Sequence, residues 1–145
     1  MKKQLLTTFL LIALIATSFA ATADSQHSVG FGIFSEHYIE DSPRFNEKNE
    51  LAYYHYQSGK DVAVIGTFKN SYFIRSHVVA AGKEYRGPLG SKIGVMLGLV
   101  EGYETVLETN CGSKLMCVPL VYVKTGIFTH MIMGPAYNLS ITVEL

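Results

Sequence analysis

The chain has 145 residues, and its twelve basic and twelve acidic side chains give a formal net charge of zero at neutral pH. This length is enough for one domain but not for two, and a balanced charge without a basic cluster argues against nucleic-acid binding. Tryptophan is absent, but nine tyrosines and eight phenylalanines could supply the aromatic side chains that membrane barrels place at the lipid–water interface.

The N-terminal residues have the pattern of a secretory signal peptide. A basic start, Met1-Lys2-Lys3, precedes an apolar run and a small-residue stretch that ends at Ala23. The apolar run is short for a membrane-spanning helix, so we expect cleavage after Ala23, or alternatively after Ala20. The predicted organisation is a signal peptide over residues 1–23 and one domain over 24–145, with no cysteine at the junction for a lipoprotein anchor.

Beyond the signal peptide the sequence predicts short β-strands separated by turn residues, without sustained helical periodicity. Eight strands are expected, over residues 27–38, 49–57, 62–69, 71–81, 92–103, 118–124, 127–133 and 136–145. Eight is the smallest common strand count among outer-membrane barrels. The predicted fold is therefore all-β, an eight-stranded antiparallel up-and-down transmembrane β-barrel.

Two features favour a membrane barrel over a secreted soluble barrel or sandwich, which alternation alone does not exclude. The last strand alternates apolar and polar residues up to Leu145, and this resembles the C-terminal signal that the barrel-assembly machinery recognises. If the N-terminus starts in the periplasm, the two longest polar loops, 40–48 and 104–116, are both external. The connection over 83–91 is longer than a periplasmic turn should be. The expected location is the bacterial outer membrane.

The fifth predicted strand has the clearest alternation in the chain. Branched aliphatic residues alternate there with Gly94, Met96 and Gly98. If the aliphatic face contacts lipid, these glycines, together with Gly30 and Gly32, leave room in the lumen for an acyl chain near Met96. Alternatively, the glycines relieve crowding and bend the strands of a narrow barrel. The sequence leaves both interpretations open.

Cys111 and Cys117 are the two cysteines of the chain and lie close together. In an oxidising compartment they should form a local disulfide that stiffens one loop. A metal site would need further ligands nearby, so we expect neither a metal nor another cofactor.

Strand counting brings three chemically useful residues to one external rim. His37 lies at the end of the first strand, and Asn70 and Ser71 follow the third. A histidine beside a serine can take the hydroxyl proton as the serine attacks an acyl carbonyl. Asn70 could orient the imidazole, although it cannot stabilise imidazolium as a carboxylate does. The alternative is an ordinary rim histidine and an ordinary turn.

These segments resemble the outer-membrane lipid A palmitoyltransferase family, small eight-stranded barrels that move a palmitoyl chain from phospholipid onto lipid A. The resemblance rests on the order of His37, Arg44-Phe45-Asn46-Glu47 and Phe68-Lys69-Asn70-Ser71. It recurs in Val118-Pro119-Leu120 and Gly134-Pro135-Ala136-Tyr137-Asn138, which look like the proline-bearing strands through which lipid enters that family sideways.

The resemblance implies acyl transfer or acyl-ester chemistry on lipid A and phospholipid. It makes His37, Asn70 and Ser71 the candidate catalytic residues, and Arg44 and Asn46 candidate substrate-binding residues, to which the pattern of the fifth strand adds Met96. The chain departs from the family at Asn70, where the family has an aspartate, and lacks room for the family's N-terminal amphipathic helix. A non-catalytic outer-membrane barrel that blocks a receptor or protects the envelope is the alternative, and a periplasmic lipid carrier is a third.

Overall fold

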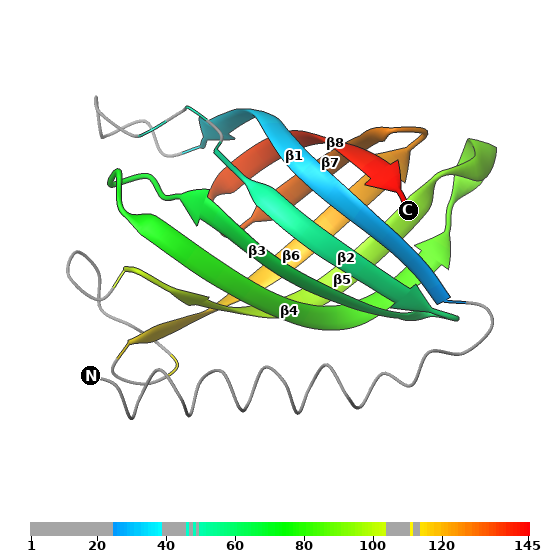
Figure 1. Ribbon diagram of the computed structural model, residues 1–145, viewed down its shortest axis with the longest axis horizontal. Coiled ribbons are helices and arrows are strands. Elements are labelled where there is room, and N and C mark those ends of the chain that lie inside the picture. The colour runs from blue at the N-terminus through cyan, green and yellow to red at the C-terminus, as the bar shows by residue number, and fades with distance from the viewer. Residues whose placement is uncertain (1–24, 39–45, 47, 49, 104–110, 112–113) are drawn as a thin grey trace.

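The computed structural model describes residues 25–38, 46, 48, 50–103, 111 and 114–145; the predicted signal peptide and Arg44 lie outside these residues. Each strand pairs with its neighbour in sequence, and β8 pairs with β1 to close the barrel (Figure 1). The eight-stranded antiparallel up-and-down barrel is therefore confirmed. Its strands are β1 (Ser25–His37), β2 (Ala52–Ser58), β3 (Asp61–Lys69), β4 (Arg75–Arg86), β5 (Lys92–Glu101), β6 (Leu115–Thr125), β7 (Phe128–Met133) and β8 (Ala136–Glu144).

The fourth strand differs most from its predicted bounds. It begins at Arg75 rather than Ser71, because the amide of Asn70 donates to the carbonyl of Ile74 and closes a tight turn before the strand. It also continues to Arg86, paired with β5 as far as Lys92. The connection to β5 is consequently shorter than predicted and contains only a 3-10 turn, Pro88–Gly90.

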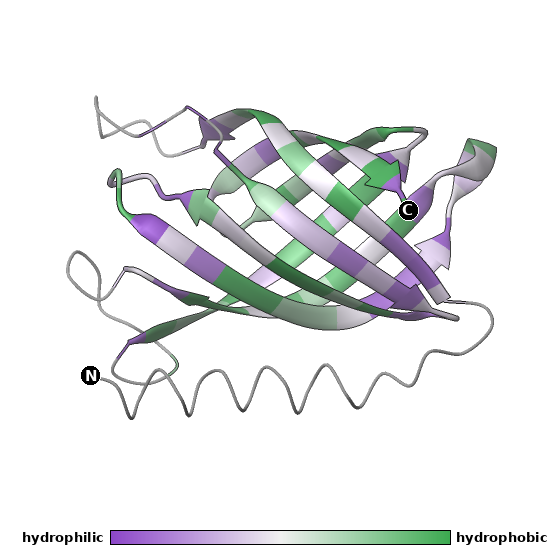
Figure 2. Cartoon of the chain, in the orientation of Figure 1, coloured by the Kyte–Doolittle hydropathy of each residue, from purple (hydrophilic) through white to green (hydrophobic). Residues whose placement is uncertain are grey.

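Hydrophobic and hydrophilic residues alternate along the strands (Figure 2). Large apolar side chains project outward from several strands: Phe31 is 57% exposed and Leu97 is 63% exposed. Inside, the half of the barrel near the β2–β3 turn is polar: the buried Glu84 carboxylate accepts a hydrogen bond from Tyr122, and Tyr122 also bonds to His55. An apolar layer separates this polar half from the other end.

Glycines on the inner face provide room for side chains of neighbouring strands. A Cβ at Gly94 would lie 2.1 Å from the ring of Tyr122, and one at Gly30 would lie 2.1 Å from the ring of Tyr53. Of the two interpretations of the glycines, relief of crowding is therefore the correct one. The cavity beside Met96 has a volume of only about 10 Å³, so the predicted space for an acyl chain near Met96 is filled by protein.

The close approach at Gly94 predicts a large effect of one methyl group. Gly94→Ala should destabilise the barrel by about 1–3 kcal/mol, because Tyr122 is fixed by its hydrogen bonds and cannot yield. Gly98→Ala is the matched control, since its Cβ would meet the end of the flexible Leu120 side chain at 2.6 Å. Urea unfolding of the purified variants in detergent micelles should give Gly94→Ala a clearly lower free energy of unfolding than Gly98→Ala. Equal stabilities would contradict this account of the packing.

Candidate functional site

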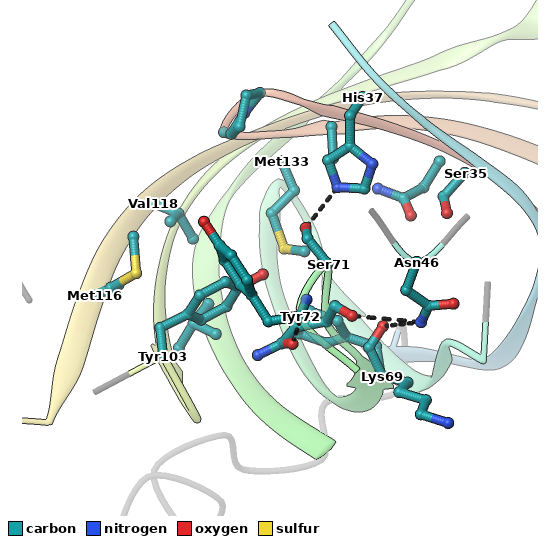
Figure 3. Close-up of a pocket in the computed structure, with 17 residues that line it drawn as sticks. Ser35, His37, Asn46, Lys69, Ser71, Tyr72, Tyr103, Met116, Val118 and Met133 are labelled. Atoms are coloured by element: carbon teal, nitrogen blue, oxygen red, sulfur yellow. Dashed lines mark hydrogen bonds between the residues drawn. The ribbon is translucent and has the colours of Figure 1, made fainter. Parts of the chain in front are cut away.

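The site end of the barrel, where β1, β3, β5 and β7 finish, contains a pocket of about 220 Å³. The site end is at the left of Figure 1, and Figure 3 draws the residues that line the pocket. His37 enters from β1 and Ser71 from the β3–β4 connection, while β5, β6 and the β7–β8 turn supply the remaining wall. The floor is apolar and includes Phe68, Val100, Val118 and Met133.

His37 and Ser71, which strand counting places at one rim, meet in this pocket. The imidazole Nε2 lies 2.6 Å from the Ser71 Oγ, although the two residues are 34 positions apart in sequence (Figure 3). The contact pairs a potential base with a potential nucleophile at hydrogen-bonding distance. The geometry can therefore support removal of the hydroxyl proton by the imidazole.

An irregularity in β1 directs His37 into the barrel. The pairing of β1 with β8 shifts register between Gly32 and Phe34, and both Ile33 and Phe34 are exposed. Simple alternation from Val29 would place residue 37 on the outward face. The bulge adds one residue and reverses the faces beyond it, which is a common role of bulges beside functional sites.

Asn70 does not orient the imidazole. Its amide nitrogen donates to the Ser76 Oγ and to the carbonyl oxygen of Gly102, both at 3.0 Å. Its carbonyl oxygen accepts from the backbone amides of Tyr72 at 2.9 Å and Ile74 at 3.0 Å. A primary amide has two donors and two acceptor positions, so groups other than His37 occupy all four. Asn70 is only 2% exposed and holds the turn that carries Ser71.

Asn46 fixes the same turn from the opposite side. Its backbone amide donates to the Ser71 carbonyl at 2.9 Å, and its side-chain amide donates to the carbonyls of Lys69 and Asn70 at 3.1 and 3.3 Å. Asn46 is 4% exposed and lines the pocket. The structure therefore places this candidate binding residue at the site, where its backbone and side-chain amides bond to the turn that carries Ser71.

Met96 lies elsewhere. It is buried below the pocket floor and does not line the pocket. Between the floor and Met96, the void beside Leu120 and Met131 is only about 20 Å³. No void large enough for an acyl chain adjoins Met96, because the glycines beside it accommodate neighbouring side chains, and its substrate-binding role stays a prediction without support from this geometry.

Tyr103 belongs to the site but was not among the predicted site residues. It lines the pocket beside Ser71, and its ring stands edge-on to that of Tyr72, with centroids 6.2 Å apart. Burial raises the pKa of Tyr103 above its usual value, while hydrogen bonds with the side chain and backbone of Ser71 act in the opposite direction. Strand counting could have indicated it, since the fifth strand ends at the same rim as Ser71.

One side of the pocket wall coincides with an incomplete ladder. The pairing of β6 with β7 ends at Leu120 and Met133, whereas the pairing of β6 with β5 continues to Leu115. Pro119 occupies the first position beyond the β6–β7 ladder and has no amide hydrogen to extend it. Met116, Val118, Gly134 and Pro135, which flank this break, all line the pocket.

Cys111 and Cys117 form the predicted disulfide, with Cα atoms 5.5 Å apart. Cys117 belongs to β6 and pairs with Leu99 of β5. The disulfide thus ties residue 111 to the strand that borders the break in the wall. Among the described residues, no group of three or more His, Cys, Asp or Glu side chains is arranged to hold a metal ion.

Comparison with protein-family models and with curated proteins finds no match to this chain. In the part of the chain that the structure describes, no helix is long and apolar enough to cross a membrane.

Proposed function

We propose that this protein is an outer-membrane acyl-ester enzyme that takes an acyl chain from a phospholipid and transfers it to lipid A. The observation that carries the proposal is the 2.6 Å contact between the His37 Nε2 and the Ser71 Oγ, set in a pocket with an apolar floor. A serine–histidine pair supplies the nucleophile and base of acyl transfer, and the apolar floor suits the substrate's hydrocarbon chain.

The distribution of polar and apolar side chains supports a membrane location. The outward residues of β5 are Ile93, Val95, Leu97 and Leu99, while the interior contains the buried Glu84. An apolar exterior around a partly polar interior is the arrangement of outer-membrane barrels and the reverse of a soluble one. The strands could then span the bilayer with the site end in the outer leaflet, where lipid A resides.

The proposed reaction has two balanced steps. In the first, the Ser71 Oγ attacks the ester carbonyl carbon of the phospholipid while its proton passes to the His37 Nε2. The tetrahedral intermediate collapses by breaking the bond to the glycerol oxygen, which takes the proton from His37 and leaves as a lysophospholipid. In the second step a lipid A hydroxyl attacks the carbonyl carbon of the acyl-serine while its proton passes to His37. The bond to the Ser71 Oγ then breaks, and the Oγ takes that proton from His37 as the acylated lipid A leaves.

The pocket limits how much of the acyl chain can enter. An apolar cavity of about 150 Å³ accommodates benzene, so 220 Å³ holds about nine carbon atoms by the same ratio. The rest of a longer chain would leave through the break in the wall at Pro119 and Pro135 and remain in the bilayer. The enzyme would therefore bind the ester end of its donor and have little selectivity for chain length.

Mass spectrometry of lipid A and phospholipids from cells with and without the protein tests the function. We expect lipid A to gain one acyl chain, with lengths that follow the phospholipid pool, and lysophospholipid to accumulate. Unchanged pools of both lipids would contradict the proposal and favour a non-catalytic surface role. A change in the gel mobility of the protein when its membrane fraction is heated verifies that the barrel is folded in the cells used for the comparison.

A further inference from the structure

We infer that Asn138 binds the ester carbonyl in the pocket: its side-chain amide donates to the carbonyl oxygen and stabilises the negative charge that forms there during acyl transfer. The charge-stabilising role rests on the proposed function, whereas the binding of an ester carbonyl by Asn138 can be measured without turnover. Asn138 lies in a segment that resembles a proline-bearing strand, and that resemblance predicts no part for it in the chemistry.

The side chain of Asn138 is buried without a protein partner. It faces the lumen from β8 and is only 7% exposed. Within the residues that the structure describes, nothing donates to its carbonyl oxygen or accepts from its amide nitrogen. Asn70, by contrast, has all four bonding positions occupied. Burying an amide without hydrogen bonds is unfavourable, so such a group in a native protein points to a ligand that completes it.

The surroundings of Asn138 leave one direction for such a ligand. On one side the residue borders the void of about 20 Å³, and the other residues that line this void are aliphatic, aromatic or methionine. Its partner on β7 is Met131. On the other side Asn138 lines the pocket that contains His37 and Ser71. A polar group that bonds to the amide therefore has to enter from the pocket.

The register of β1 and β8 places Asn138 close to the His37–Ser71 pair. His37 pairs with Ala136, and Asn138 lies two residues further along the same face of β8. Diagonal neighbours of this kind lie about 7–8 Å apart, within reach of long side chains. An ester whose carbonyl carbon contacts the Ser71 Oγ can therefore direct its carbonyl oxygen toward Asn138, while His37 remains bonded to the serine.

A fixed amide in this position acts on the charge that the reaction creates. As the Ser71 Oγ bonds to the carbonyl carbon, one electron pair of the carbonyl moves to its oxygen, which becomes an oxyanion. The Asn138 Nδ2 donates to that oxygen and keeps both of its protons. When the bond to the glycerol oxygen breaks, the carbonyl forms again. The hydrogen bond is strongest in the transition state, so it lowers the activation free energy.

Asn138→Leu tests this role, because it removes the amide and keeps a side chain of similar size beside the void. Ser140→Ala is the matched control from the same face of β8: Ser140 is fully buried, lies outside the pocket lining and bonds to the Tyr53 Oη at 3.1 Å. We expect Asn138→Leu to lower kcat for a phospholipid ester about 10²–10³-fold with KM nearly constant, as for loss of one oxyanion donor.

Urea unfolding in micelles should separate the two variants in the opposite sense. Asn138→Leu should unfold at the wild-type urea concentration or above it, because no protein hydrogen bond is lost. Ser140→Ala should unfold at a lower concentration and keep the wild-type kcat, because it loses hydrogen bonds within the barrel. If Asn138→Leu were destabilised as much as Ser140→Ala, the amide of Asn138 would be structural and the proposal would be wrong.

A second measurement requires no turnover. The side-chain amide protons of Asn138 are followed by NMR in the Ser71→Ala protein, in micelles of dihexanoylphosphatidylcholine and of its diether analogue, which has no carbonyl groups. The signal is assigned by its loss when Asn138→Leu is added. We expect it further downfield in the ester lipid. The side-chain amide of Asn70, which bonds only to protein, should have the same shift in both lipids.

Each result decides a separate question. Wild-type turnover with an Asn138→Leu kcat within threefold of wild type would overturn the charge-stabilising role. Equal Asn138 shifts in the two lipids would mean that the amide bonds to water and not to the ester, and would overturn the binding role. Absence of wild-type turnover, combined with a shift that depends on the ester, would support ester binding by Asn138 and count against the proposed acyl transfer alone.

Discussion

His37→Ala should lower acyl-transfer turnover by about 10²–10⁴-fold, the usual contribution of a positioned general base. The reason is local: the His37 Nε2 lies 2.6 Å from the Ser71 Oγ. Without the imidazole the hydroxyl proton has to leave without a base. Lipid extracted from reactions with defined phospholipid donors, analysed by mass spectrometry, measures the loss.

The matched control is His77→Ala. His77 also lies near the site end, two residues into β4, but its side chain is exposed on the outside of the barrel. This variant should transfer acyl chains at nearly the wild-type rate. Heat-modifiable gel mobility should show that both variants fold. If His37→Ala kept more than half of the wild-type turnover in an assembled barrel, His37 would not be the base.

Asn70→Asp should destabilise the barrel and should not increase turnover, although it supplies the carboxylate that usually orients a catalytic imidazole. A carboxylate could still accept from the amides of Tyr72 and Ile74, but it could not donate to the Gly102 carbonyl. Its second oxygen would face that carbonyl in a site only 2% exposed. Leaving a buried charge poorly compensated costs about 3–5 kcal/mol.

Urea unfolding in micelles measures the stability of Asn70→Asp, and the lipid assay measures its turnover. Gln57→Glu is the control for exchanging an amide for a carboxylate: Gln57 lies at the opposite end of the barrel and accepts a hydrogen bond from Lys92, which a carboxylate also can do. This control should lie within about 0.5 kcal/mol of wild type. An Asn70→Asp protein that is as stable as wild type and more active would restore the predicted His37–Asn70 contact.

The sequence is sufficient for the topology and for placing His37 and Ser71 at the same rim, whereas the inward direction of the His37 side chain depends on the bulge in β1. Alternation and turn residues define eight strands, and in a barrel of successive antiparallel strands the parity of each connection determines its end. Two connections separated by an even number of strands must share a rim. That argument requires no side-chain detail, which explains why it locates the site.

The remaining features depend on contacts that no local pattern encodes. The sequence alone leaves Asn70 available to contact His37, whereas in the fold the Ser76 Oγ and the Gly102 carbonyl accept both of its side-chain amide hydrogens. The missing side chain of Gly94 suggests open space in the lumen, but the ring of Tyr122 from the next strand fills that space. In both cases a residue distant in sequence uses the hydrogen-bonding group or the space that was predicted to serve the candidate site.

The register shift in β1 determines which residues of its second half face the lumen. Before the shift the even-numbered residues face the lumen, and after it the odd-numbered residues do. The change occurs at Ile33 and Phe34, which both face outward. If the same residues paired with β8 without the shift, the inward and outward sets would be exchanged beyond that point. Glu36 would then turn toward the lumen and His37 toward the surroundings of the barrel. The extra residue at Ile33 and Phe34 is therefore what brings His37 into the pocket in a strand of this length.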